Sequence, residues 1–215
     1  FSLFIYNRFR KSQVQKKVIE LQHKKLDVSH KDLTDSINYA KRIQAAVLPP
    51  NKLLKKYLKD VFIFYSPKDI VAGDFYWLEA NDKYIFFAVA DCTGHGVPGA
   101  LVSVFCNNAL NRSVREHGLI LPNEILEKCR KILIEEFEKS DDDVTDGMDI
   151  SLCVLNKNEL MFSGANLPLW INRNGEIIEI KGDRQPIGKF NLQNPFTLHK
   201  ESIIKGDLIY LFSDG

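Results

Sequence analysis

The stretch Ala88-Val-Ala-Asp-Cys-Thr-Gly-His-Gly-Val-Pro-Gly99 contains the strongest structural signal in the chain. A bulky apolar run at residues 84–90 leads into it and has the length and composition of a buried strand. Pro98 begins a helical pattern that continues to about residue 116. Asp91 therefore lies where a strand ends, and a glycine-rich loop joins that strand to a helix. Such a loop presents backbone N–H groups to an anion such as phosphate.

Two further aspartates occupy comparable positions. Asp74 follows a glycine before an aromatic run, and Asp214 precedes a glycine after the apolar run at residues 208–212. A carboxylate at the end of a buried strand is unfavourable unless it is paired or binds a cation. Because Mg²⁺ and Mn²⁺ prefer oxygen ligands, three such turns at one sheet edge predict a two-metal site that activates water. We therefore expect Asp74, Asp91 and Asp214 to converge.

The apolar patterns outside these turns predict strands, then two helices, then strands. The strands are expected at residues 61–66, 75–78, 84–90, 150–155, 159–163, 169–172, 176–180 and 208–212. The helices are expected at residues 98–116 and 122–138. Their buried faces would be Val97, Leu101, Val104, Phe105 and Leu110 in the first, and Ile125, Leu126, Cys129, Ile132, Leu133 and Phe137 in the second. Asn174-Gly175 is a hairpin signal. This order predicts an α+β fold with two adjacent helices on a mostly antiparallel sheet.

Residues 13–48 are predicted to form a helical linker, since no glycine or proline interrupts the chain before Pro49 and Pro50. Steps of four and three residues trace a heptad-like seam: Ile19, His23, Leu26, His30, Leu33, Ile37, Ala40, Gln44 and Val47. The seam favours a parallel coiled-coil homodimer, and its polar members would weaken the contact between the two helices. The alternative is an amphipathic helix that packs on its own domain.

Residues 1–12 combine an apolar start with a basic flank. Residues 1–31 contain eight Lys/Arg against two acids, a net charge of +6, so the whole-chain charge of +1 leaves −5 for the remainder. Apolar residues followed by Arg and Lys are typical of the cytoplasmic end of a transmembrane helix, although six residues are too few to span a bilayer. We expect a cytoplasmic domain tethered to the inner face of the membrane, with an upstream sensor region. The alternative is an apolar, frayed terminus.

Several function classes are disfavoured. Cys92, Cys106, Cys129 and Cys153 form no CxxC pair, so we expect reduced, partly buried thiols rather than a zinc or redox motif. The loop after Asp91 lacks the Lys-Ser/Thr of a P-loop. The acidic balance beyond residue 31 argues against nucleic acid as a partner and against a metal-dependent nuclease.

Four motifs occur in order: Gly73-Asp-Phe-Tyr76, Ala90-Asp-Cys-Thr-Gly-His-Gly-Val-Pro-Gly-Ala100, Gly164-Ala-Asn-Leu-Pro-Leu169 and Ser213-Asp-Gly215. Together they resemble the SpoIIE (stage II sporulation protein E) branch of the PPM, or type 2C, serine/threonine protein phosphatases, over residues 49–215. The resemblance implies a four-layer αββα sandwich with two Mn²⁺ or Mg²⁺ ions between the sheets. It also implies hydrolysis of phosphoserine or phosphothreonine on an anti-anti-sigma-like regulatory protein.

The same resemblance assigns metal ligands. Asp91 would bridge both ions, the Cys92 carbonyl would complete one of them, Asp74 would hold a metal or its water, and Asp214 would bind the second ion. The family has a further metal aspartate downstream of the Asp-Gly turn, so we expect the domain to be incomplete at Gly215. A non-catalytic interaction module with the same fold is the alternative function.

The substrate-side candidates are Gly94, His95, Gly96, Asp149 and Asn166. His95 is either a general acid or a residue that shapes its turn between two glycines. Asp149 has a possible substrate role, and we favour the simpler interpretation of a polar residue at the start of a strand. Asn166 matches the family loop, and asparagine is also a common turn residue.

Overall fold

The structure is a computed structural model that describes every residue except 1, 59, 140–145, 191–192 and 214–215, and it describes no side chains for residues 2–5. The chain divides into two compact units, Phe1–Arg42 and Ile43–Gly215. The expected metal ligand Asp214 lies outside the described residues.

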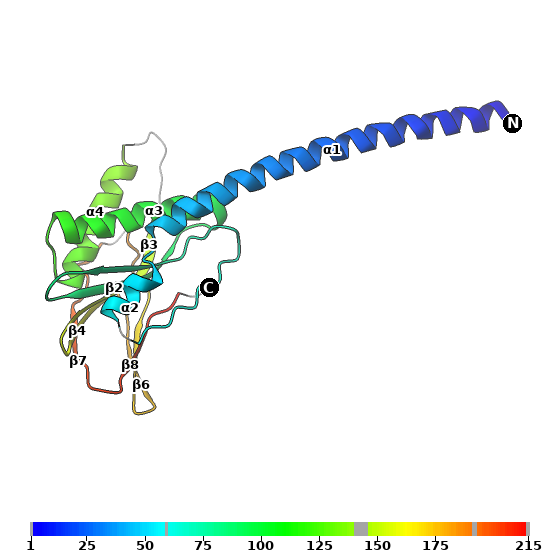
Figure 1. Cartoon of the computed structure of the whole chain (residues 1–215). Coiled ribbons are helices and arrows are strands. Elements are labelled where there is room, and N and C mark those ends of the chain that lie inside the picture. Colours follow the sequence, from blue (N-terminus) through cyan, green and yellow to red (C-terminus); the bar gives the residue numbers. More distant parts are fainter. Residues whose placement is uncertain (1, 59, 140–145, 191–192, 214–215) are drawn as a thin grey trace. The chain divides into compact units, whose positions relative to one another are not determined.

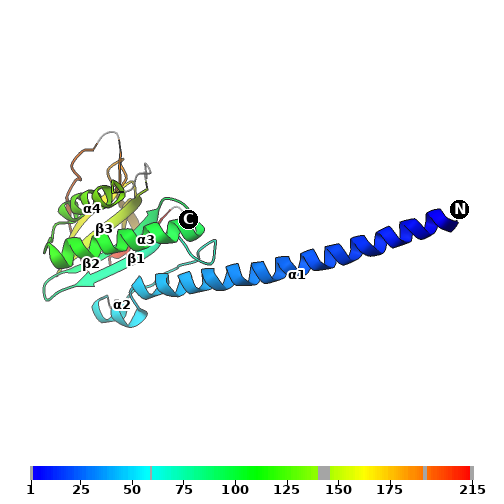
Figure 2. The ribbon, with the colours of Figure 1, turned by 90° about the horizontal axis from the view of Figure 1, so that it is seen from above.

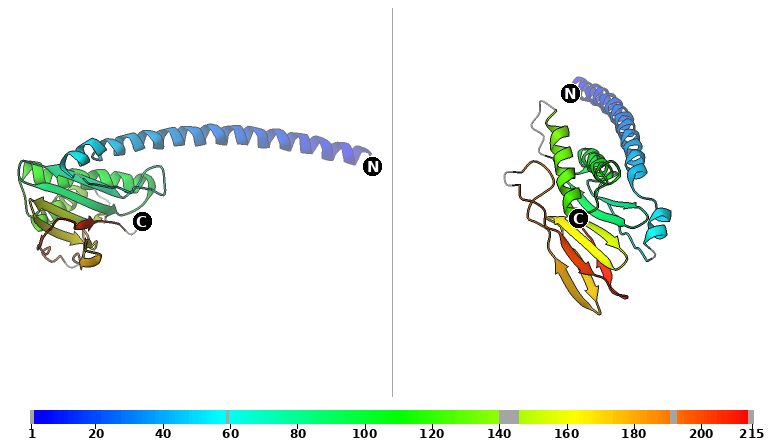
Figure 3. Two further views of the ribbon diagram at one scale, coloured as in Figure 1. Left: turned by 60° about the horizontal axis from the view of Figure 1, so that its bottom comes forward. Right: turned by 90° about the vertical axis from the view of Figure 1, so that its left-hand side faces the viewer.

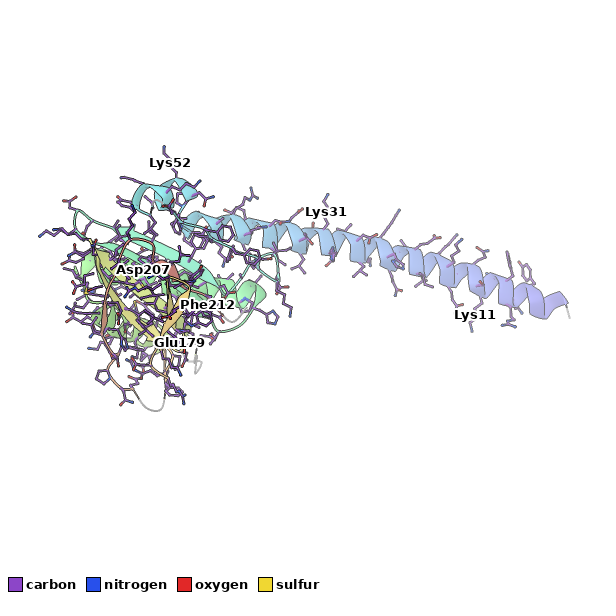
Figure 4. The ribbon with its side chains drawn as sticks, turned by 90° about the horizontal axis from the view of Figure 1, so that it is seen from below. Lys11, Lys31, Lys52, Glu179, Asp207 and Phe212 are labelled. Carbon is purple, nitrogen blue, oxygen red and sulfur yellow. The ribbon has the colours of Figure 1, made fainter. Side chains whose placement is uncertain are left out.

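Helix α1 (Ser2–Val47) begins earlier than the expected linker helix and ends where expected, just before Pro49. Its side chains at residues 6–33 are all exposed, and Lys11 and Lys31 project from it into solvent (Figure 4). Among the described helices, none is long and apolar enough to cross a bilayer.

The segment after α1 differs from the expectation. A short helix, α2 (Asn51–Tyr57), follows Pro50 and buries Leu54. The strand expected at residues 61–66 is wrong, because this segment pairs with no strand among the described residues. Phe62 and Phe64 are 87% and 82% exposed. Aromatic composition favours a strand only where a neighbouring edge accepts its hydrogen bonds.

The larger sheet is antiparallel and has the order β1-β2-β3-β4-β7. Its strands are β1 (Phe75–Ala80), β2 (Ile85–Cys92), β3 (Met148–Asn156), β4 (Glu159–Ala165) and β7 (His199–Ser202). The four-residue edge strand β7 was not predicted, because its sequence, His-Lys-Glu-Ser, has no apolar alternation.

Two helices cover one face of this sheet (Figure 1). Helix α3 (Gly96–Asn111), continued by the π-helical turn η1 (Arg112–Glu116), lies over β1 and β2, and α4 (Pro122–Phe137) lies over β3 and β4 (Figure 2). The predicted face of α4 is confirmed, since Ile125, Leu126, Cys129, Ile132 and Leu133 are buried.

The predicted buried face of α3 is largely wrong. Leu101 and Phe105 are 60% and 51% exposed, and only Leu110 of the expected set is fully buried. The helix instead buries small residues, among them Gly99, Ala100, Cys106 and Ala109. A face of small side chains lets the helix backbone approach the sheet closely, and hydrophobicity alone does not identify such a face.

A second antiparallel sheet has the order β6-β5-β8, formed by β5 (Leu169–Arg173), β6 (Glu176–Ile180) and β8 (Leu208–Tyr210). Its hairpin turns at Asn174 and Gly175, with φ of 53° and 91°, as the sequence predicts. Side chains from both sheets form one apolar cluster between them: Cys153, Leu160, Phe162, Leu169, Ile171 and Ile180. Figure 3 shows this helix–sheet–sheet layering.

On the outer face of the second sheet, Trp170 donates to Glu179, and its ring centre lies 4.8 Å from that of Phe212 in an edge-on arrangement. The α+β class is confirmed. The second helical layer of an αββα sandwich is not among the described residues.

Candidate metal and phosphate site

Two aspartates meet across the central strands. Asp91 on β2 is paired in register with Asp149 on β3. Ala90 and Cys92 belong to the core beneath the helices, so strand alternation turns Asp91 to the opposite face, toward the second sheet. Asp149 has the same parity on β3 as Cys153, which lies in the cluster between the sheets. Paired residues of antiparallel strands share a face, so the two carboxylates are neighbours.

Asp74 lies directly before β1, whose first residue, Phe75, pairs with Ala90. This places Asp74 at the same sheet end as Asp91. A Cβ atom on Gly73 would lie 2.8 Å from the Gly94 carbonyl oxygen and 2.9 Å from that of Cys92. Only glycine therefore allows the Asp74 loop to approach the Cys92 carbonyl this closely.

The Asp74 carboxylate also affects a neighbouring tyrosine. The Tyr65 hydroxyl donates to the Asp74 carbonyl oxygen at 3.1 Å. Burial raises the pKa of Tyr65, and the negative charge of Asp74 raises it further. Tyr65 therefore stays protonated at neutral pH and remains a hydrogen-bond donor.

An open pocket of about 330 Å³ lies beside the aspartate pair. It is lined by Asp91, Asp149, Asn166, Leu167, Pro168, Phe212 and Ser213. Asn166 has a left-handed backbone, with φ of 58°, and its Nδ2 donates to Asp149 Oδ1 at 2.8 Å. Its own N–H donates to the Asp183 carbonyl at 2.8 Å. Asn166 therefore turns the chain and also holds Asp149, which lies at the start of β3. A substrate role for Asp149 stays a prediction.

The loop after Asp91 is hydrogen-bonded to the segment that directly precedes β3. Thr93 Oγ1 donates to Asp146 Oδ1 at 2.7 Å, and the Thr93 N–H donates to the Gly147 carbonyl at 3.1 Å. Gly94 and Gly96 both have positive φ, 84° and 60°, so the turn between them requires glycine.

The side chain of His95 is exposed, and its Nδ1 lies 3.1 Å from Asp69 Oδ2. None of Gly94, His95 and Gly96 lines the pocket at Asp91. Asp69 was not singled out from the sequence, because no glycine turn or strand end marks it.

The four cysteines are free and buried, as expected. Burial raises the pKa of the Cys92 thiol well above its ordinary value, and the adjacent Cys106 thiol adds to this effect. The Cys92 side chain belongs to the apolar core beneath the helices, on the opposite strand face from Asp91. The Cys92 carbonyl lies beside Gly73, in the Asp74 loop.

The complete set of predicted ligands is not described. Among the residues that the structure does describe, no three His, Cys, Asp or Glu side chains are grouped closely enough to hold a metal ion. Asp74 and Asp91 lie at the same sheet end and Asp214 is outside the description, so their convergence stays a prediction.

The chain shares its helix-covered antiparallel sheet, packed on a second sheet, with the PP2C (type 2C) class of phosphatase domains. More particularly, the chain belongs to the stage II sporulation protein E (SpoIIE) family, whose profile matches residues 81–215.

Individual relatives agree with this family. The chain is 30% identical to the SiaA-PP2C domain of Pseudomonas aeruginosa, with a TM-score of 0.77 over 87% of this chain and 74% of that one. It is 25% identical over 203 residues to the phosphoserine phosphatase RsbU of Bacillus subtilis, covering 90% of this chain and 57% of RsbU. It also shares its fold with RsbX, solved in complex with magnesium, at 18% identity and a TM-score of 0.52 over 67% of each chain. The chain thus spans little more than half the length of RsbU.

Proposed function

We propose that this protein hydrolyses phosphoserine or phosphothreonine on a protein substrate with the help of two Mn²⁺ or Mg²⁺ ions. The observation that carries the proposal is the in-register pair of Asp91 and Asp149, which together line a pocket. The membership of the chain in this family supports the same function. Asp74, Asp91, the Cys92 carbonyl and Asp214 would hold the ions.

The donors fit hard divalent cations. The described candidates offer carboxylate and carbonyl oxygens, which Mg²⁺ and Mn²⁺ prefer. The pocket lining contains no Lys or Arg among the described residues. Without cations, a phosphate group would therefore meet only negative and neutral groups there. When bound, the two ions supply a water that ionises near neutral pH and positive charge for the phosphoryl oxygens.

The remaining residues would orient the substrate. Asn166 would orient the Asp149 carboxylate through its amide, which donates to Oδ1. Gly94 and Gly96 carry no side chains, so the backbone of the loop after Asp91 would be accessible to a phosphoprotein. His95 lies between these glycines with its ring exposed to an incoming substrate.

The test is phosphate release by the full-length protein from a phosphoserine peptide with Mn²⁺. Asp91→Asn should reduce the rate by about 100-fold or more, because it removes a charged carboxylate that would hold the ions. Asp82→Asn, in the exposed turn between β1 and β2, is the matched control and should leave the rate unchanged. No release by the wild type, or equal rates in the wild type and Asp91→Asn, would reject the proposal.

A non-catalytic module is the competing outcome of this test. Calorimetric titration of Mn²⁺ distinguishes the two: a phosphatase takes up two ions, and loses them in Asp91→Asn. A protein that binds neither ion nor releases phosphate would be an interaction module.

The proposed substrate is an anti-anti-sigma-like regulatory protein. Its support is the family resemblance, together with the relative RsbU, which is named a phosphoserine phosphatase. The wild type should dephosphorylate such a regulator with a higher kcat/KM than a peptide containing the same phosphoserine. Equal values for the two would argue against a protein-specific docking step.

The linker is proposed to form a parallel dimer. Ile19, Leu26 and Leu33 of the seam are 53%, 64% and 61% exposed in the single chain. An isolated helix gains little stability from propensity alone, so a partner that buries these side chains would stabilise it. Gln44 does not belong to this seam, because it is buried and bonded inside the second unit.

Sedimentation of the full-length protein tests the dimer. Leu26→Glu with Leu33→Glu should give a monomer, whereas Lys24→Glu with Lys31→Glu, two charge changes on the same helix, should not. A wild-type monomer would reject the dimer.

The basic flank at Arg8, Arg10 and Lys11 supports a membrane-tethered arrangement with an upstream sensor. Recovery of the full-length protein in the soluble cell fraction would reject the tether.

A further inference from the structure

The connection between β6 and β7, residues 181–198, packs against the turn that lines the pocket. A Cβ atom on Gly182 would lie 2.6 Å from the carbonyl oxygen of Leu167, which belongs to the pocket lining. The N–H of Asn166, a second lining residue, donates to the Asp183 carbonyl at 2.8 Å. The start of the connection is therefore in direct backbone contact with the pocket wall.

A second anchor lies a few residues further along the connection. Met148 and Ile187 exchange two backbone hydrogen bonds, at 2.9 and 2.8 Å. Met148 directly precedes Asp149 on β3, so this anchor lies at the sheet end that carries the aspartate pair. Arg184 lies between the two anchors and is therefore held at the same sheet end.

The neighbours of Arg184 are both bound to other parts of the fold. The Asp183 carboxylate accepts from the Thr197 N–H at 2.7 Å and from Thr197 Oγ1 at 2.9 Å. Gln185 is buried, and its Oε1 accepts from Arg130 at 3.3 Å. Arg184 itself is exposed and makes no hydrogen bond or ion pair within the described part of the chain. Its guanidinium is therefore available to a ligand.

The charge of the connection is opposite to that of the pocket. Three basic residues, Lys181, Arg184 and Lys189, occur in it against one acid, Asp183. The described lining of the pocket has two carboxylates and no Lys or Arg. An acidic substrate would be repelled by these carboxylates, and a cation at the edge of the pocket would offset that repulsion.

We propose that Arg184 binds a carboxylate of the substrate protein, so that the preferred substrate is a phosphoserine flanked by Asp or Glu. This inference rests on the proposed phosphatase function and adds a substrate class to it. Arginine pairs with carboxylates through two parallel hydrogen bonds. Because Arg184 lies outside the pocket lining, it meets the neighbours of the phosphoserine and not the phosphate itself.

Two phosphoserine peptides that differ only in flanking charge test this role in the full-length protein with Mn²⁺. One carries glutamates on both sides of the phosphoserine, and the other carries glutamines there. The wild type should have a KM about fivefold lower for the glutamate peptide, with a similar kcat, as one exposed ion pair can provide. Arg184→Gln should remove this difference, and Arg184→Glu should reverse it.

The matched control is Lys205→Glu, which makes the same change of charge in the exposed turn between β7 and β8. This turn lies at the other end of the sheet, because the Ile203 N–H donates to the Asn158 carbonyl in the β3–β4 turn. Lys205→Glu should keep the preference of the wild type.

A binding measurement separates recognition from catalysis. Fluorescence anisotropy with non-hydrolysable phosphonate versions of both peptides should show about fivefold tighter binding of the glutamate version. The difference should shrink as salt is added, since exposed charge pairs are screened, and Arg184→Gln should abolish it. The small substrate p-nitrophenyl phosphate has no flanking residues, so the wild type and Arg184→Gln should hydrolyse it equally.

Equal KM values for the two peptides in the wild type would overturn the role. A preference that survives in Arg184→Gln, or that disappears in Lys205→Glu as well, would also overturn it. A slower reaction of Arg184→Gln with p-nitrophenyl phosphate would show that the residue serves the pocket or the fold instead. A wild type that releases no phosphate from any of the three substrates would reject the phosphatase function, and this inference with it. An active wild type without a preference rejects only the inference.

Discussion

Asn166 adopts a backbone conformation that most residues avoid, and from it the side chain reaches Asp149. We expect Asn166→Ala to destabilise the protein by about 1 kcal/mol, because alanine is disfavoured at positive φ, and to lower phosphatase activity about tenfold through the lost amide. Asn166→Gly keeps the backbone and removes only the amide. It should therefore lower activity without the loss of stability seen in thermal unfolding. Full activity in Asn166→Gly would contradict the positioning of Asp149 by this side chain.

Gly73 is a second residue whose replacement tests the site. A Cβ atom there would overlap the Gly94 and Cys92 carbonyl oxygens, so Gly73→Ala should displace the Cys92 carbonyl. We expect a loss of about 1–3 kcal/mol in unfolding free energy and weaker Mn²⁺ binding by calorimetry.

The control for this prediction is Gly175→Ala in the remote β5–β6 hairpin, where φ is 91° and no atom lies within 4 Å. It should also destabilise the protein, but with unchanged Mn²⁺ affinity. Equal affinities in the two variants would show that Gly73 serves only the fold.

The sequence predicted part of the site at this scale. Asp91 and the glycines around His95 were recognisable because a buried strand leads into a glycine-rich turn. The contact of Asp149 with Asn166 could not be predicted, because Asn166 directly follows the next strand and strand register cannot be read from the linear sequence. No local sequence pattern marks Asp69, because the feature that distinguishes it is its contact with the distant residue His95.

At the scale of elements, the last turn of α1 is bound to the Asp74 loop. Gln44 Nε2 donates to the Ala72 carbonyl and to Ser103 Oγ, and the Ala72 N–H donates to Gln44 Oε1 at 3.2 Å. Gln44→Ala would leave both backbone groups of Ala72 unpaired in a buried position. We expect a destabilisation of about 1–3 kcal/mol in chemical denaturation.

Because Ala72 is two residues from Asp74, the same variant should bind Mn²⁺ more weakly. Gln22→Ala, at an exposed position of α1, is the matched control for both measurements. Mn²⁺ affinity equal to that of the wild type would show that this turn is a purely structural anchor.

Helix α4 holds the long connection between β6 and β7 through one buried arginine. Arg130 donates to Glu127 at 2.7 Å and to the Asn194 carbonyl at 3.0 Å, and its guanidinium lies 4.3 Å from the ring centre of Phe196. Arg130→Ala should destabilise the protein by about 2–3 kcal/mol. We expect a smaller loss than for a fully buried ion pair, because Glu127 is one-third exposed.

Arg130→Lys should recover only part of that loss, since an ammonium group cannot reproduce the planar fork. Lys131→Ala, next to it on α4 but exposed, should have little effect. Urea unfolding of the three variants makes the comparison, and a fully stable Arg130→Ala would contradict it.

The elements themselves were largely predictable, with instructive exceptions. The strong 3.6-residue pattern of α4 identified its buried face correctly, whereas α3 buries small residues and exposes Leu101 and Phe105. The run at residues 61–66 has the composition of a strand but no described partner. Composition indicates which secondary structure a segment favours. A strand forms only where a neighbouring strand is available to pair with it.

For the whole molecule, bound cations should contribute to stability. A ligand that binds only the folded state stabilises it by about 2.7 kcal/mol at 100 times its Kd. Scanning calorimetry should therefore show a higher Tm with Mn²⁺ and a return to the lower value with EDTA. Asp91→Asn should have the same Tm with and without the ion, whereas a rise equal to that of the wild type would place the cations elsewhere.

The pairing of Asp91 with Asp149 also determines when, during folding, a cation is first captured. These two residues come from strands separated in the chain by α3, η1 and α4, so their pairing is a long-range contact. Long-range pairing of this kind forms late. A nascent chain would thus acquire its ions only at the end of its maturation, and Mn²⁺ should slow unfolding while leaving the refolding rate unchanged.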